Sequence, residues 1–249
     1  MDSQAKTLSA DPSARDLRAD GHQEISNWWR LPLLAGSLGV ICLVLLDVPL
    51  ASWIKFNKVP GELKNLLDAG EHFGTPYGQL MILLTLISVG CLSWPRATRI
   101  FLGTVAAGLS ANVLKLMVAR SRPRVIDFEG FSVWESFAGA FPLGLGGSGI
   151  QSFPSAHTAS AFGFAVMMFW AFPRGRVAFF VLAMLTALQR VCASAHFPSD
   201  VCFGAAIGWS VASLFVHWNR LAKPLERWED HAREMGSESP MERNNVKAA

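Results

Sequence analysis

Long apolar segments separated by short polar junctions dominate the pattern of the chain. A bilayer core of about 30 Å is crossed by roughly 20 mostly apolar helical residues. Backbone groups in lipid must be paired within the chain, which favours helices over open strands. Six segments approach the required length, and the first is interrupted by Asp47. They are Leu31–Ile54, Tyr77–Trp94, Arg99–Ala119, His157–Phe172, Val177–Ala195 and Val201–Trp218.

This pattern predicts an all-α fold, a polytopic membrane bundle of six transmembrane helices. We expect residues 31–218 to form the six-span domain, with polar and disordered tails at 1–30 and 219–249. The first thirty residues lack a cleavable secretory signal, so the first apolar segment is expected to remain as a signal-anchor.

Basic residues in the short junctions predict the orientation. Lys and Arg accumulate on the cytoplasmic side of membranes, so these junctions and both tails are expected to be cytoplasmic. The loops at 55–76, 120–153 and 196–200 then face outward, which is the periplasmic side in the inner membrane of a bacterium. The junctions contain Arg96 and Arg99, Arg174 and Arg176, and Arg220 and Lys223.

Composition agrees with a membrane protein and excludes some other classes. Only 16% of residues are charged, against about 25% in soluble domains. A net charge of +3 without a basic–aromatic stripe argues against nucleic-acid binding. The four cysteines show no metal-ligand spacing, although a disulfide between Cys192 and Cys202 is conceivable.

Three polar stretches break the apolar pattern on the predicted outer side. The first is "KLMVARSRP", residues 115–123. Lys115 and Arg122 would share a helix face if the helix persists to Pro123, with Arg120 and Arg124 close by. The alternative is that these are snorkelling residues at the end of a span.

The second stretch is "SFPSAHTAS", residues 152–160. A proline suits a helix start, and Ser155 can cap the first turn. The free N–H groups near Ala156 and His157 would then bind an anion. The alternative for His157 is an interfacial histidine whose hydrogen bonds are satisfied.

The third stretch is "RVCASAHFPSD", residues 190–200, where Phe-Pro-Ser recurs and predicts another helix start. Asp200 would lie within reach of His196 and could accept its Nδ1–H. A simple N-terminal capping acid is the alternative for Asp200.

Together these stretches place cations, two histidines, a serine and a carboxylate at one membrane face. Ionisable groups at a membrane edge are functional by default, and cations with helix N-termini indicate a multiply charged anion such as phosphate. The sequence offers no acidic cluster for Mg²⁺ or Zn²⁺, so we expect no metal and no cofactor.

The motif order resembles that of the type 2 phosphatidic acid phosphatase superfamily, which includes membrane lipid phosphate phosphatases and vanadium haloperoxidases. The resemblance rests on Lys115-x₆-Arg122-Pro123, Pro154-Ser155-Ala156-His157 and Arg190-x₅-His196-x₃-Asp200. Two positions depart from the family pattern: Ala156 replaces a glycine, and Gln189 replaces a serine. The methyl group of Ala156 matters only if its backbone needs a positive φ.

The resemblance implies a phosphohistidine mechanism that needs no metal. His196 would attack phosphorus while Asp200 orients it. His157 would protonate the leaving group and then activate water. The equatorial phosphate oxygens would be bound by Lys115, Arg122, Ser155, Ala156 and Arg190.

Several functions fit these features. The leading one is an integral membrane lipid phosphatase with its site at the outer face, acting on phosphatidic acid, phosphatidylglycerophosphate, undecaprenyl pyrophosphate or lipid A phosphate. A phosphate-binding transporter would need a polar path through the bilayer. A vanadate-dependent haloperoxidase would share the anion site, and an inactive lipid-binding scaffold would lack turnover. The sequence carries no signal for oligomeric state.

Overall fold

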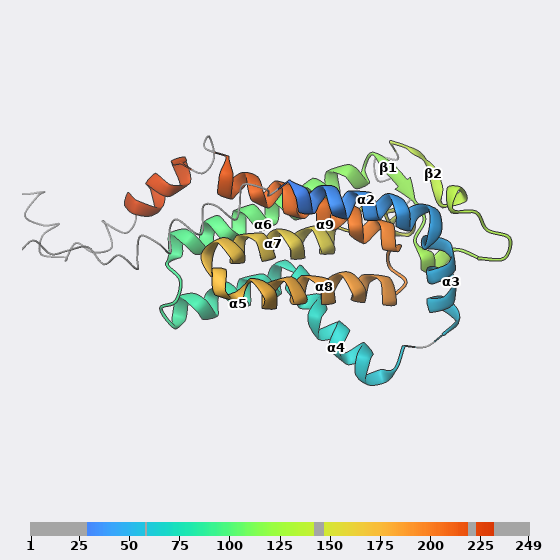
Figure 1. Ribbon diagram of the computed structural model, residues 1–249, viewed down its shortest axis with the longest axis horizontal. Helices are drawn as coiled ribbons and strands as arrows, with labels where there is room; N and C mark the ends of the chain where they lie inside the picture. Colours follow the sequence, from blue (N-terminus) through green and yellow to red (C-terminus); the bar gives the residue numbers. More distant parts are fainter. Residues whose placement is uncertain (1–28, 58, 142–146, 219–222, 232–249) are drawn as a thin grey trace, which may run out of the picture.

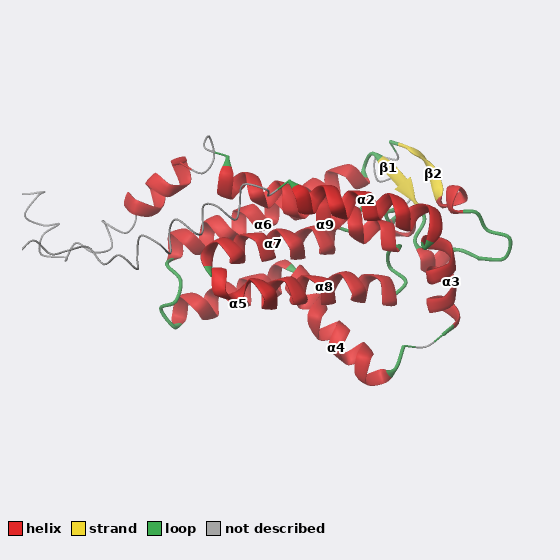
Figure 2. Cartoon of the chain, viewed as in Figure 1, coloured by secondary structure: helices red, strands yellow, loops and turns green. Residues whose placement is uncertain are grey.

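Helices make up most of the chain in the computed structural model, which describes residues 29–57, 59–141, 147–218 and 223–231 (Figures 1 and 2). The labelled α-helices are α2 (Arg30–Leu45), α3 (Asp47–Phe56), α4 (Gly61–Glu71), α5 (Pro76–Ser88), α6 (Trp94–Lys115), α7 (Ala156–Ala171), α8 (Arg176–Cys192) and α9 (Pro198–His217). Two short strands, β1 (Val118–Arg120) and β2 (Phe137–Ala140), pair antiparallel. The 3₁₀ segments are His72–Gly74, Pro123–Val125, Val133–Ser136, Ser148–Ile150 and Pro173–Gly175.

The helices confirm an integral membrane bundle. Within the described ranges, α6, α9 and the segment Pro173–Cys192 are each long and apolar enough to cross a bilayer. The bent pair α2–α3 passes the same test as a fourth span, while α5 and α7 are apolar but shorter, at 13 and 16 residues. The count of six spans therefore stays a prediction.

The first predicted span, Leu31–Ile54, is broken at the position that the sequence marked. α2 and α3 meet at Asp47 with a bend of 69°, and α3 turns across one end of the bundle (Figure 1). The carboxylate of Asp47 is fully buried at this bend. The break places an acid where it can pair with a cation inside the protein instead of lying in lipid.

The centre of the bundle is α7, which packs against α6, α8 and α9. Its side chains are buried almost all round, as expected for a helix that is hydrophobic on every face. Glycines let α9 approach it closely: a Cβ at Gly208 would lie 2.1 Å from the carbonyl oxygen of Ala159, and one at Gly204 would lie 2.5 Å from that of Ser155. Such small residues allow helix backbones to come together in membranes.

The helix that was expected to carry both Lys115 and Arg122 does not continue that far. α6 ends at Lys115, and β1 follows at Val118–Arg120. The backbone of β1 is hydrogen-bonded to β2 from the long outer loop, so a strand replaces the helix. Lys115 and Arg122 therefore approach one another across a turn and a strand, and the shared helix face was wrong.

A buried arginine, Arg99, lies near the start of α6, at the end of the bundle away from α3. Arg99 lies inside α6, not in a junction, and is fully buried. Its Nη1 lies 3.4 Å from Glu229, its Nη2 donates to the Phe215 carbonyl at 2.7 Å, and it stacks on Trp170. Glu229 belongs to a helix at 223–231, so this part of the expected C-terminal tail is ordered.

Other expectations concern the cysteines and the loops. All four cysteines are free, so the conceivable disulfide between Cys192 and Cys202 is absent. Residues 1–28 and 232–249 lie outside the described residues, as do residues 144–146 of the glycine-rich segment at 144–149. The predicted start of α9 at Pro198 is confirmed. For α7 the Ser155 cap is confirmed, but the helix begins at Ala156 and Pro154 precedes the cap, so the proline does not start the helix.

Candidate active site

The three motifs meet at one end of the bundle. Lys115 ends α6, His157 lies in the first turn of α7, and the turn from α8 to α9 carries His196. His157 interacts electrostatically with Lys115, Arg122, Arg190 and His196. Segments distant in the sequence thus bring two imidazoles and three cations to one place, at the end where α3 and the strands lie (Figure 1).

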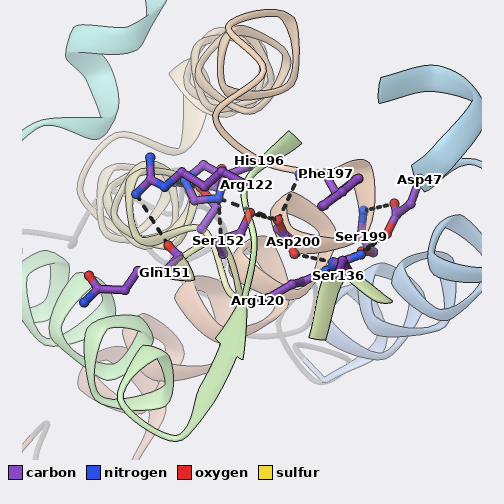
Figure 3. Close-up of polar contacts among 12 residues, drawn as sticks. Asp47, Arg120, Arg122, Ser136, Gln151, Ser152, His196, Phe197, Ser199 and Asp200 are labelled. Atoms are coloured by element: carbon purple, nitrogen blue, oxygen red, sulfur yellow. Dashed lines mark hydrogen bonds and ion pairs between the residues drawn. The ribbon is translucent and has the colours of Figure 1, made fainter. Parts of the chain in front are cut away.

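His196 is held in one orientation by a backbone carbonyl. Its ring is 2% exposed, and its Nδ1 lies 2.7 Å from the carbonyl oxygen of Ser152 (Figure 3). A carbonyl oxygen only accepts, so Nδ1 carries the proton and the lone pair is on Nε2. Asp200 Oδ2 lies farther away, at 3.7 Å from Nδ1.

Burial is the main influence on the charge of His196. Desolvation holds the pKa of His196 below its usual value, and nearby Lys115 and Arg122 lower this pKa further. The carboxylate of Asp200 acts in the opposite direction. The imidazole is therefore neutral at neutral pH, which is the form that can act as a nucleophile.

Asp200 acts on His196 chiefly through Ser152. One carboxylate oxygen accepts hydrogen bonds from the Ser152 hydroxyl at 2.5 Å and from the Phe197 N–H at 2.9 Å. The other accepts from Arg120 Nη1 at 2.5 Å. Asp200 thus caps α9 and also fixes the residue whose carbonyl holds the histidine ring. The sequence left two alternatives for Asp200, a capping acid or an acid that orients His196, and one side chain can fill both roles.

The sequence did not predict the structural role of Arg120. It was grouped with the outer basic cluster, but it is fully buried and paired with protein acids. Its Nη2 lies 2.7 Å from Asp47, and Nη1 donates to Asp200 and to Ser199. The Phe197 ring lies 4.2 Å from its guanidinium carbon.

We call Asp47, Arg120, Ser152, Ser199 and Asp200 the inner network (Figure 3). Asp47 also accepts from the backbone N–H of Ser199 at 2.9 Å, so the bend between α2 and α3 is tied to the first turn of α9. Two carboxylates around one guanidinium are compensated by short, charge-assisted hydrogen bonds. The inner network therefore supports the loop that carries His196.

We call Lys115, Arg122 and Arg190 the phosphate face. Arg122 donates weakly from Nη2 to the Gln151 carbonyl at 3.4 Å. Among the residues that the structure describes, none accepts a hydrogen bond from its buried Nε. Burial and the neighbouring Arg124 and Arg190 lower the pKa of Arg122. An unpaired buried donor among repelling cations indicates a site for an anion.

The first turn of α7 provides further donors. Ser155 Oγ accepts from the Thr158 N–H at 3.4 Å and from the Thr158 hydroxyl at 3.0 Å, which confirms the predicted cap. The helix start leaves the N–H groups of Ala156 and His157 for a ligand. Ala156 is helical and has no positive φ, so its methyl group strains nothing.

Sequence reasoning also missed the acids of α4. Glu71 Oε1 lies 2.5 Å from Arg190 Nη2 and 4.0 Å from His157 Nε2. Asp68 accepts from Gln189 Nε2 at 3.0 Å. The available signal was the pair of acids in "DAGE", residues 68–71, within a loop that the orientation placed on the outer side.

The arrangement combines a neutral, oriented imidazole with a second imidazole and several anion-binding donors. In the part of the chain that the structure describes, no three His, Cys, Asp or Glu side chains gather in a metal-binding group. Such a site can bind a phosphate group, attack it with a nitrogen nucleophile and transfer a proton to a leaving group.

Comparisons with known proteins agree with the motifs. The model of the PAP2 superfamily matches residues 96–224. A lipid A 1-phosphatase of Rhizobium johnstonii is 29% identical over 186 residues, which cover 68% of this chain and 71% of that protein. A decaprenylphosphoryl-5-phosphoribose phosphatase of Mycobacterium tuberculosis is 31% identical over 148 residues, covering 58% and 73%. The crystal structure of Aquifex aeolicus LpxE shares the fold, with a TM-score of 0.52, 22% identity and coverage of 69% and 94%.

Proposed function

Because the chain belongs to the PAP2 superfamily, we propose that it is an integral membrane phosphatase that removes phosphate from a lipid. The observation that carries this proposal is the orientation of His196. Its Nδ1 is held by the Ser152 carbonyl, which leaves the Nε2 lone pair for attack beside Lys115 and Arg122. Relatives named as lipid A 1-phosphatases make phosphorylated glycolipids the first substrates to test.

In the first step, His196 Nε2 attacks phosphorus and the bond from phosphorus to the leaving oxygen breaks. His157 gives its proton to that oxygen, so that a neutral alcohol departs. The product on the enzyme is a phosphohistidine. The negative charge that spreads over the equatorial oxygens is stabilised by the phosphate face and by the backbone amides of Ala156 and His157.

In the second step, His157 takes a proton from water, and the resulting hydroxide attacks phosphorus. The phosphorus–nitrogen bond breaks, inorganic phosphate leaves, and His196 recovers its neutral ring. The inner network keeps the ring oriented throughout, because Asp200 fixes Ser152. This scheme uses only side chains and backbone amides of the protein together with water, and it requires no metal.

The membrane arrangement is part of the proposal. We take α2–α3, α5, α6, α7, α8 and α9 as six spans, with both termini cytoplasmic and the site at the outer face. The basic junctions support this orientation by the positive-inside rule. A lipid head group would then reach the site while its acyl or prenyl chains remain in the bilayer.

The decisive experiment is phosphate release from a panel of lipid mono- and pyrophosphates in detergent, with wild type beside His196→Ala. We expect turnover by the wild type and none above background by the variant. Activity should persist in EDTA, and orthovanadate should inhibit. Normal rates for a folded His196→Ala would contradict the nucleophile assignment, and loss of activity on chelation would contradict the metal-free scheme.

A further inference from the structure

α4 brings a fixed negative charge to the mouth of the site. Glu71 is its last residue, and its carboxylate pairs with Arg190 at 2.5 Å. The same oxygen lies 4.0 Å from Nε2 of His157. A carboxylate beside a phosphate-binding cation cluster is unexpected, because it repels the ligand that the cations attract.

The position of Glu71 is set by the packing of α4 on α8. The Thr186 hydroxyl donates to the Gly70 carbonyl at 2.7 Å, and a Cβ at Gly70 would meet Leu185 at 2.6 Å. The amide of Gln189, one of the two departures from the family pattern, bonds to Asp68 at 3.0 Å. These contacts of Asp68 and Gly70 with α8 place Glu71 at the site, where its side chain remains a quarter exposed.

The side of the pocket on which Glu71 lies follows from the proposed roles of the histidines. His196 attacks from one side of phosphorus, and His157 protonates the group that leaves on the other. Glu71 is next to His157, so it lies on the side of the leaving group. An alcohol leaving group is neutral after protonation, whereas the leaving group of a pyrophosphate is itself a phosphate with negative charge.

We propose that Glu71 makes the pocket selective for phosphate monoesters of neutral alcohols and against lipid pyrophosphates. This inference rests on the proposed phosphatase function and narrows its substrate class. The second phosphate of a pyrophosphate would lie beside the Glu71 carboxylate, and like charges at this range disfavour binding and reaction. A monoester places only its alcohol there, and hydroxyl groups of a sugar or glycerol could donate to the carboxylate.

Two lipids that differ only in the leaving group test this selectivity. Dioleoyl phosphatidic acid releases a neutral diacylglycerol, and dioleoylglycerol pyrophosphate releases phosphatidic acid. We expect the wild type to have the higher kcat/KM for the monoester. Glu71→Gln should reduce this preference by about tenfold, because one partly screened charge is removed. The matched control Glu62→Gln removes an exposed acid from the first turn of α4 and should keep the wild-type ratio.

The possible outcomes separate the two proposals. A folded Glu71→Gln with the wild-type ratio, or a wild type that prefers the pyrophosphate, overturns the role of Glu71 while the phosphatase function stands. Absence of His196-dependent phosphate release from both lipids overturns the function itself. If Glu71→Gln does not fold, the wild type can be tested with two inhibitors, orthophosphate and methylenediphosphonate. We expect orthophosphate to inhibit more strongly than methylenediphosphonate. If orthophosphate inhibits equally or less strongly, the inference about Glu71 is overturned.

Discussion

The inner network and the phosphate face contain the same kind of side chain in opposite states. Arg120 is fully buried and bonds to two carboxylates, Asp47 and Asp200. Arg122, only two residues later, has a buried Nε that finds no partner within the described part of the chain. The compensated arginine supports the loop that carries His196, and the uncompensated one is available for a ligand. The charge that serves structure has its partners within the protein and is fully buried, whereas the charge available for binding is only partly buried and keeps an unused donor.

The largest effect should come from breaking the inner network. Arg120→Met leaves two buried carboxylates without their cation, and we expect a loss of about 3–5 kcal/mol in the free energy of unfolding. Thermal unfolding of the purified protein in detergent measures this loss. An inactive Arg120→Met with wild-type unfolding would show that the inner network serves catalysis directly and not structure.

Arg122→Met should spare the fold and impair catalysis. Removing one preorganised donor of a transition-state anion costs about 10²–10³ in rate, so kcat/KM should fall by that order while the unfolding temperature stays near that of the wild type. Inhibition by orthovanadate should weaken in parallel. Arg124→Met is the control, because this exposed neighbour carries the same charge outside the phosphate face.

The pH dependence should connect the two regions. We expect a bell-shaped profile, in which neutral His196 sets the acid limb and protonated His157 sets the alkaline limb. Because burial lowers the pKa of His196, the acid limb of kcat/KM should lie below about pH 6.5, the usual value. Unfolding restores the usual pKa, so the unfolded state binds more protons in that range and stability falls as pH drops.

Arg122 tests this connection further. Its charge lowers the pKa of His196, so Arg122→Met should move the acid limb to higher pH, and Arg124→Met should move it less. A profile that is flat between pH 5 and 9 in the wild type would count against the paired roles of the two histidines.

The smallest effect should come from an exposed pair on α4. Lys64 pairs with Asp68, but the two side chains are 65% and 40% exposed. Exposed pairs of this kind contribute little, since water and salt screen them. Lys64→Ala should therefore leave the unfolding temperature unchanged. A clear decrease would show that α4 depends on this pair for its attachment to the bundle.

The sequence was sufficient to predict that the residues of the phosphate face and both histidines lie together. Polar stretches within an otherwise apolar sequence can be recognised without a structure. Four of the site residues lie in such stretches: Lys115, Arg122, His157 and His196. The helix starts were predictable as well, because proline and serine have specific preferences at the first turn. The convergence of these stretches followed from placing all of them on one side of the membrane.

The inner network could not be predicted, because its bonds join residues distant in the sequence. Arg120 pairs with Asp47, 73 positions away, and with Asp200, 80 positions away. β1 has only three residues and no periodic signal, so nothing local showed that Arg120 would turn inward. Asp47 was visible as the one acid within the first apolar segment, but its partner was not.

The close contact of α9 with α7 at Gly204 and Gly208 has a mechanical consequence. A helix backbone that almost touches its neighbour cannot slide or tilt independently, so the two helices behave as a single rigid body. His157 stands at the start of α7, and His196 lies two residues before the start of α9. If the proposed roles of the two histidines hold, we expect the spacing between the His196 ring and the His157 ring to stay constant while a lipid enters and the product leaves.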